Sequence, residues 1–246
     1  MPKPHRYVTD EPCIPFDLDV LYEDSGIIVA DKPHFLATTP RGMWYRQTAL
    51  IRLREAYGEE GIIPAHRLDR MTAGIVVFVR DPALRGAYQT LFQERRTVKT
   101  YECLAPCAPM RRPRTGTIER LEAPRTFPLR RRSRIVKTRG VLQAYEEPGV
   151  PNAETVVALA RDAGRSDGLR AYVLRPKTGK THQLRVHMNA LGLPIAGDDL
   201  YPRIETRPYD DFTRPLELVA RRLEFTDPVT GAHRTFTSRI PLGGGR

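Results

Sequence analysis

One short segment of the chain combines residue types that can do covalent or proton-transfer chemistry. In residues 66–74, the carboxylate of Asp69 stands between two arginines, Arg67 and Arg70. Two neighbouring guanidinium groups favour the ionised carboxylate, and an ionised, well-placed carboxylate can act as a nucleophile or as a general base. The segment leads directly into an unbroken apolar run at 75–79. A structural arginine–aspartate cluster would look the same, so this segment alone leaves both interpretations open.

Three further segments hold polar and aromatic residues in compact patterns. Residues 177–187 read Lys-Thr-Gly-Lys-Thr-His-Gln-Leu-Arg-Val-His and include Arg185. Residues 96–101 end at Tyr101, and residues 197–201 read Gly-Asp-Asp-Leu-Tyr. Taken singly, Tyr101 could be a core aromatic in a strand, and Arg185 could be an exposed charge on a helix.

Several familiar motifs fail on inspection, and their failure narrows the chemistry. A phosphate-binding loop ending at Gly179 to Thr181 would need glycine at 174, where this chain has leucine. His182 and His187 are five residues apart, whereas a zinc-binding helix spaces its histidines by four. The three cysteines cannot complete a disulfide framework. We therefore expect no metal, no nucleotide cofactor and no other cofactor.

The composition indicates a folded protein whose basic charge fits either a polyanionic partner or a solvated basic surface. The 246 residues can build a sizeable core, and a hydrophobic content of 40% is too high for a disordered chain. Forty basic and 29 acidic residues give a net charge of +11, which favours association with nucleic acid. No apolar run approaches the roughly 20 residues of a membrane span, and the N-terminus lacks the apolar core of a signal peptide. We expect a cytoplasmic protein that does not engage a membrane.

The first hundred residues predict two helices among several strands. Apolar residues recur at helical spacing over 48–57, and Gly58 follows as a stop. Pro82 stands where a helix running to about residue 95 would begin. The β-branched run at 75–79 predicts a strand buried on both faces. Further strands are expected at 20–22, 27–30 and 98–104, and a loop is expected at 34–45.

The second half of the chain begins with a strongly basic segment. Residues 108–140 are rich in arginine, with three in succession from Arg130, and contain four prolines. This pattern fits either an extended β-ribbon or a solvated loop. A helix is expected at 180–191, and strands are expected at 155–160, 170–174, 218–220, 222–225 and 234–238. Because strands outnumber helices and do not alternate with them regularly, the pattern predicts a mixed α+β fold.

Taken together and in order, these segments resemble the motifs of the RluA family of RNA pseudouridine synthases. The most distinctive matches are His-Arg-Leu-Asp-Arg at 66–70 and Thr-Gly-Lys-Thr-His-Gln-Leu-Arg-Val-His at 178–187. The segment ending at Tyr101 lies between them, and an earlier strand ends in Asp-Lys-Pro at 31–33, as in the family. The resemblance extends over about residues 18–240. It implies the pseudouridine synthase fold, with a mixed, largely antiparallel central sheet and flanking helices and loops.

The resemblance also implies a domain organisation and a set of catalytic residues. We expect an extended N-terminal arm over 1–17, then one catalytic domain over 18–242, without an RNA-binding module of the S4 type. The catalytic aspartate of the family matches Asp69, and the tyrosine that stacks on the target base matches Tyr101. The arginine that pairs with the catalytic carboxylate matches Arg185.

Three more residues are implied as substrate contacts, and two positions depart from the family pattern. Leu184 matches the aliphatic residue that lines the uracil pocket, and Arg67 and Arg70 would hold backbone phosphates or the loop itself. Residues 34–40 lack the usual glycine after Asp-Lys-Pro, and Met71 replaces a common acidic or polar residue. The first departure leaves loop 34–45 uncertain as a substrate contact.

The resemblance implies that the protein isomerises a uridine of ribosomal RNA, of tRNA or of both to pseudouridine. We expect the protein to be a monomer. The atoms are conserved, so the reaction needs no redox carrier. Two alternatives remain at this point. A catalytically inactive RNA-binding protein of the same fold would have no need of Asp69, Tyr101 and Arg185 together. A glycoside hydrolase would normally use two carboxylates, and the distinctive segments offer only Asp69.

Overall fold

The computed structural model describes residues 11–160 and 168–243. Over these residues the chain forms twelve strands, three α-helices and one short 3-10 helix. The strand pairs with a defined register are antiparallel. These features confirm the prediction of an α+β fold.

Contacts between residues divide the chain into two units, each described here by itself. The first unit takes in the described residues up to Val98, together with 208–213 and 220–240. The second unit takes in the described residues from Lys99 to Arg207, together with 214–219 and those from Pro241 onward. Of the predicted arm at 1–17, residues 1–10 lie outside the described part of the chain, and residues 11–17 have no regular secondary structure.

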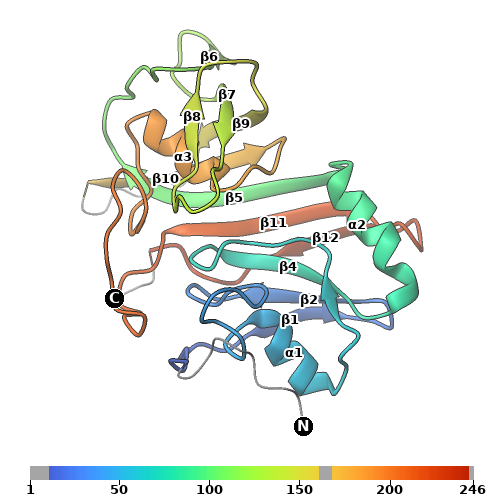
Figure 1. Cartoon of the computed structure of the whole chain (residues 1–246). Coiled ribbons are helices and arrows are strands. Elements are labelled where there is room, and N and C mark those ends of the chain that lie inside the picture. Colours follow the sequence, from blue (N-terminus) through green and yellow to red (C-terminus); the bar gives the residue numbers. More distant parts are fainter. Residues whose placement is uncertain (1–10, 161–167, 244–246) are drawn as a thin grey trace. The chain divides into compact units, whose positions relative to one another are not determined.

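The first unit is built on antiparallel strands around a central strand, β4. The order β1-β2-β4-β11 is read directly from the strand pairing, with β12 added beside β11 and the short β3 beside β4 (Figure 1). The strands are β1 (Asp19–Glu23), β2 (Ile27–Lys32), β3 (Ile63–Pro64), β4 (Ala73–Val79), β11 (Leu218–Thr226, in this unit from Ala220) and β12 (His233–Thr237). The strands expected at 20–22 and 27–30 are present as β1 and β2, which pair in antiparallel fashion, and the strand expected at 75–79 is confirmed as β4.

The core of this unit fixes β4 from both sides. All seven residues of β4 are buried, and full burial of one large aliphatic side chain contributes roughly 1.5–3 kcal/mol. Two helical segments belong to the unit, α1 (Ala49–Tyr57) and η1 (Pro82–Leu84) continued by α2 (Arg85–Gln93). One apolar cluster joins strands and helix, and it contains Ile27, Val29, Ile75, Val77, Val79, Tyr88, Leu91, Leu223 and Phe225. The loop that leads into β4 is therefore attached to a rigid strand.

The second unit pairs its strands in the order β5-β10-β9-β7-β6, with β8 beside β7. The strands are β5 (Thr97–Pro106), β6 (Thr117–Arg120), β7 (Leu129–Val136), β8 (Tyr145–Glu147), β9 (Ala153–Leu159) and β10 (Leu169–Pro176). The basic segment forms β6 and β7, whose register pairs Thr117 with Arg132. Of the two structures considered for this segment, the β-ribbon is the one observed.

Helix α3 (Gln183–Ala190) is shorter than the helix expected at 180–191. His182 precedes it with a left-handed backbone, φ 53°, so Lys180 and Thr181 lie in a turn rather than in the helix. The turn is held by the Gln183 side chain. Its Oε1 accepts from the Thr178 hydroxyl at 2.7 Å and from the Lys180 N–H at 3.0 Å. This use of Gln183 explains why the helix begins where it does.

Candidate active site

Asp69 lies on the loop between β3 and β4, residues 65–72, which we call the aspartate loop. The N–H of Thr72 donates to the carbonyl of Asp69 at 3.1 Å, which closes the loop on itself. Thr38 holds it from outside, since its buried hydroxyl donates to the Leu68 carbonyl at 2.9 Å and accepts from the Leu68 N–H at 3.1 Å. The residue before Asp69 therefore has both backbone groups fixed by one side chain.

Lys32, at the end of β2, supports the other side of Asp69. Its wholly buried ammonium group donates to the carbonyls of Leu36 at 2.7 Å, Pro33 at 3.0 Å and Arg70 at 3.3 Å. Burial lowers the pKa of Lys32 to about 7, and the Asp69 carboxylate opposes this shift. Lys32 is thus an internal link between the aspartate loop and the chain that follows β2.

We expect Lys32→Met to lower the free energy of unfolding by about 2 kcal/mol, because one buried and two partly buried carbonyls lose a donor, and an unsatisfied buried acceptor costs about 1–3 kcal/mol. The measurement is urea denaturation of the full chain. The control is Lys137→Met, since Lys137 is exposed and its loss leaves the aspartate loop untouched. Equal stability of the two variants would contradict the role given to Lys32.

The end of the aspartate loop that joins β4 is equally constrained. His66 accepts from the N–H of Val77 at 3.2 Å, and its ring stacks on Phe92 with centroids 4.2 Å apart. Gly74 has φ 110°, and a Cβ added there would lie 2.4 Å from the carbonyl oxygen of Ala220 in β11. Glycine is therefore required at this position by the close approach of another backbone.

The two arginines that flank Asp69 differ in their surroundings. Arg67 is exposed, whereas Arg70 is half-buried. The Arg70 guanidinium carbon lies 5.3 Å from the centre of the Trp44 ring, a cation–π contact. Arg70 thus contributes to holding the loop, and Arg67 presents its charge to solvent.

In the second unit, α3 buries both residues singled out on it, Leu184 and Arg185. The Arg185 guanidinium pairs with the Asp198 carboxylate through two hydrogen bonds of 2.9 and 2.5 Å, and with Asp199 at 2.7 Å. The guanidinium carbon also lies 5.4 Å from the centre of the Tyr201 ring. Asp198 and Asp199 belong to the Gly-Asp-Asp-Leu-Tyr segment noted in the sequence, where neither was assigned a role.

The turn at 197–201 is itself built around Asp198. The same carboxylate accepts from the N–H groups of Leu200 at 2.8 Å and Tyr201 at 2.9 Å. The Tyr201 hydroxyl donates to the carbonyl of Ala144 at 2.7 Å and accepts from its N–H at 2.8 Å. The position of the Arg185 guanidinium is therefore fixed by a turn whose own geometry depends on Asp198.

Tyr101 is a half-buried residue of β5, placed opposite Leu174 of β10.

His187 is fully buried on α3, between the hydroxyls of Thr155 at 2.9 Å and Ser133 at 3.0 Å. Burial lowers the pKa of His187 to about 3, so the ring is neutral and its two hydrogen bonds are structural.

The six predicted site residues fall into two groups. Asp69, Arg67 and Arg70 share the aspartate loop of the first unit, and Tyr101, Leu184 and Arg185 belong to the second unit. Sequence reasoning missed the residues that hold these groups in place, Thr38, Lys32 and Asp198. The Asp-Lys-Pro and Gly-Asp-Asp-Leu-Tyr motifs were the available signals for two of them.

A model of the RNA pseudouridylate synthase family matches residues 26–190. The chain therefore belongs to the RNA pseudouridylate synthase family, whose members are isomerases that act on RNA. The match contains Asp69, Tyr101, Leu184 and Arg185.

Comparison with curated relatives narrows the assignment of the chain within this family. The chain is 32% identical over 215 residues to the dual-specificity RNA pseudouridine synthase RluA of Vibrio parahaemolyticus, covering 85% of this chain and 78% of the relative. The protein of the same name from Haemophilus influenzae is 31% identical over 90% of this chain and 93% of its own length. That of Escherichia coli K12 is 31% identical over 89% and 91%. These relatives confirm the resemblance to the RluA family.

Solved structures show the same fold. Human RNA pseudouridylate synthase domain containing 1 has a TM-score of 0.62 at 24% identity and covers 94% of this chain and 87% of its own. Human RNA pseudouridylate synthase domain containing 4 has a TM-score of 0.62 at 22% identity, and the match covers 90% of this chain and 88% of that chain. The predicted pseudouridine synthase fold is therefore confirmed.

Proposed function

We propose that Asp69 is the catalytic carboxylate with which this synthase isomerises a uridine in a stem-loop of ribosomal RNA, of tRNA or of both. The observation that supports this most strongly is the support of the aspartate loop by Thr38, Lys32 and Trp44. A catalytic group must be held close to its productive geometry. The hydrogen bond from the buried Lys32 to the backbone of the loop provides support of this kind.

The reaction breaks the bond between uracil N1 and ribose C1′, turns the base and joins C5 to C1′. The C5 proton leaves and N1 gains a proton, so atoms and charge balance without an oxidant or a cofactor. Asp69 either attacks C1′ or removes the C2′ proton. The target must leave its helix to react, and we assign Tyr101 to stacking on the loose base, worth roughly 1–3 kcal/mol.

The other four site residues are proposed to have the roles that the resemblance to the RluA family implies. Arg185 would pair with the catalytic carboxylate, Leu184 would line the uracil pocket, and Arg67 and Arg70 would contact phosphates or the loop. Arg185 is already oriented by Asp198 and Asp199, which limits the directions in which its remaining donors can point.

The basic segment 108–140 is the proposed surface for the RNA backbone, but its arginines are not equivalent. Arg131 is fully buried against Glu146 at 2.6 Å, so it does not belong to the surface. Arg132 and Arg134 pair with glutamates at 2.7 and 2.6 Å. Within the described parts of the chain, five exposed arginines of this segment make no ion pair, namely Arg111, Arg112, Arg114, Arg120 and Arg139. These five are the proposed phosphate contacts.

Changing Arg112 and Arg114 to glutamine should weaken RNA binding and reduce its salt dependence. Each lost phosphate contact removes roughly 0.7–0.9 from the slope of log affinity against log salt. The measurement is filter binding at several salt concentrations. The control changes Arg132 and Arg134, which lose the same formal charge. Identical slopes for both pairs would mean that net charge, and not these contacts, governs binding.

The proposed activity is tested with RNA labelled with tritium at uridine C5. The protein alone should release the label to water, because C5 loses its proton when the new bond forms. No release from any cellular RNA would reject the proposal. Mapping pseudouridine in total RNA with and without the gene would then identify the target.

We also propose that the protein works as a monomer in the cytoplasm. Among the helices of the described residues, none has the length and apolar character needed to cross a membrane. Sedimentation at micromolar concentration tests the oligomeric state.

A further inference from the structure

The described end of the N-terminal arm, residues 11–16, is fastened to the chain that precedes α1, and we call these residues the strap. The Glu11 carboxylate accepts three backbone hydrogen bonds, from the N–H groups of Tyr45 at 2.8 Å, Arg46 at 2.9 Å and Gln47 at 2.7 Å. Hydrogen bonds from successive amides to one carboxylate are charge-assisted and stronger than neutral ones. One side chain of the strap thus fixes the backbone of three consecutive residues.

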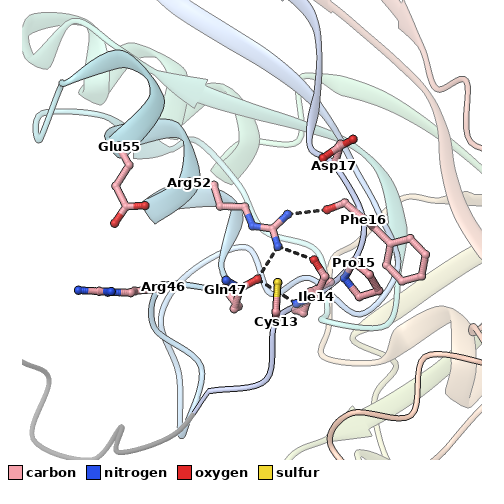
Figure 2. Close-up of a pocket in the computed structure, with 9 residues that line it drawn as sticks. All are labelled: Cys13, Ile14, Pro15, Phe16, Asp17, Arg46, Gln47, Arg52 and Glu55. Atoms are coloured by element: carbon pink, nitrogen blue, oxygen red, sulfur yellow. Dashed lines mark hydrogen bonds between the residues drawn. The ribbon is translucent and has the colours of Figure 1, made fainter.

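Arg52 of α1 fastens the other end of the strap, as Figure 2 shows. Its guanidinium donates to the carbonyls of Phe16 at 2.5 Å and Ile14 at 2.9 Å, and to the side-chain oxygen of Gln47 at 2.5 Å. The N–H of Ile14 donates to the same Gln47 oxygen at 3.0 Å. Ile14 is buried, so the strap is held by apolar contact as well as by polar contacts.

The strap also borders an open surface pocket of about 660 Å³ (Figure 2). Residues from the strap, from the segment before α1 and from α1 itself line it, namely Cys13, Ile14, Pro15, Phe16, Asp17, Arg46, Gln47, Arg52 and Glu55. None of the six predicted site residues is among them. The pocket therefore belongs to the strap and is not the site of the chemistry.

The segment that the strap fixes, residues 34–47, is the one that supports the aspartate loop, and we call it the bridging segment. Within it, Thr38 holds both backbone groups of Leu68, and the His34 ring donates to the carbonyl of Met71 at 2.9 Å. The Trp44 ring makes the cation–π contact with the Arg70 guanidinium. The bridging segment contains only isolated bridges, turns and bends, so its conformation depends on contacts with other segments of the chain.

We propose that the strap is a positioning element for Asp69, with Glu11 and Arg52 as positioning residues that act through the bridging segment. This inference rests on the proposed role of Asp69. Glu11 fixes the backbone of residues 45–47, which follow Trp44 directly. Trp44 in turn holds the side chain of Arg70, the neighbour of Asp69, through the cation–π contact. Phe16 adds to this by stacking on Phe35 at 5.9 Å between centroids. Loss of the strap leaves Asp69 present but less well placed.

The test compares Glu11→Ala with Glu55→Ala in the full chain. Glu55 is exposed and lines the same pocket, and it lies outside the contacts that fasten the strap. A small misplacement of a catalytic group can reduce a rate up to about 100-fold. We expect Glu11→Ala to lower kcat for tritium release by about 10-fold while RNA affinity changes less than twofold. Glu55→Ala should match the wild type, and Glu11→Gln, which keeps one acceptor oxygen, should recover part of the rate.

Trp44 supplies an independent readout, because it is the single tryptophan of the chain. We expect its emission to shift to longer wavelength in Glu11→Ala, at a temperature where circular dichroism shows the variant folded. A core variant of matched stability in the second unit, Val157→Ala in β9, should change neither kcat nor the emission. A wild-type kcat in Glu11→Ala, or an equal loss of kcat in Glu11→Ala and Val157→Ala, would overturn the proposal. A wild-type protein without any activity would instead contradict the proposed function, and the Trp44 emission would still decide whether the strap fixes the bridging segment.

Discussion

Asp69→Asn will reduce tritium release by on the order of 10³-fold or more, because an amide can neither attack C1′ nor accept the C2′ proton as a carboxylate does. The asparagine side chain has nearly the same shape as the aspartate side chain. The hydrogen bonds from Thr38 and Lys32 go to the backbone of Leu68 and Arg70, so the loop should remain in place. Single-turnover release of label from the RNA measures the effect.

RNA affinity separates this chemical role from a structural one. We expect Asp69→Asn to bind RNA within a few fold of the wild type and to unfold at a slightly lower urea concentration, because the buried Lys32 ammonium loses the charge that opposes the lowering of its pKa. Asp19→Asn, at an exposed residue of β1, is the matched control and should be fully active. A collapse of RNA affinity in Asp69→Asn would show that Asp69 maintains the loop and does not take part in the reaction.

Asp198→Asn is the second change with a large expected effect, and it acts through Arg185. The Arg185 and Asp198 side chains are both almost completely buried, and removing one partner of a buried ion pair costs about 3–5 kcal/mol. Asparagine also replaces the oxygen pair that binds Arg185 and the N–H groups of Leu200 and Tyr201. We expect the free energy of unfolding to fall by about 3 kcal/mol and the activity of the folded variant to fall by on the order of 100-fold.

Asp199 provides the control for this prediction within the same turn. It makes one hydrogen bond to Arg185, and its side chain is partly exposed, so solvent screens its charge. Asp199→Asn should therefore cost about 1 kcal/mol and leave most of the activity. Urea denaturation and tritium release together decide the matter, and equal losses in the two variants would contradict the special role of Asp198.

The sequence predicted those parts of the fold whose causes are local. Thr48 and Gly58 mark the ends of α1, and the structure uses them as N-cap and left-handed C-cap. The run at 75–79 had to be buried on both faces because every residue in it is apolar. The predicted start of α3 was wrong by three residues, because the Gln183 side chain accepts hydrogen bonds from the Thr178 hydroxyl and the Lys180 N–H, which holds residues 178–182 in a turn.

The supporting contacts of the site could not be predicted, because they join residues far apart in the sequence. Thr38 reaches Leu68, and Glu11 reaches Gln47, and no pattern of spacing indicates such pairs. The basic segment shows the same limit. Its arginines look alike in the sequence, yet strand pairing places Arg132 beside Glu154 and buries Arg131, leaving others exposed.

The close approach of Gly74 to Ala220 has a consequence for the order in which the protein is made. Ribosomes deliver β2, β4 and the aspartate loop long before β11, so the edge of β4 that receives β11 waits unpaired during synthesis. An open edge of an entirely apolar strand is a site for wrong association between nascent chains. Cells that make this protein quickly should therefore depend on chaperones until residues 220–226 emerge.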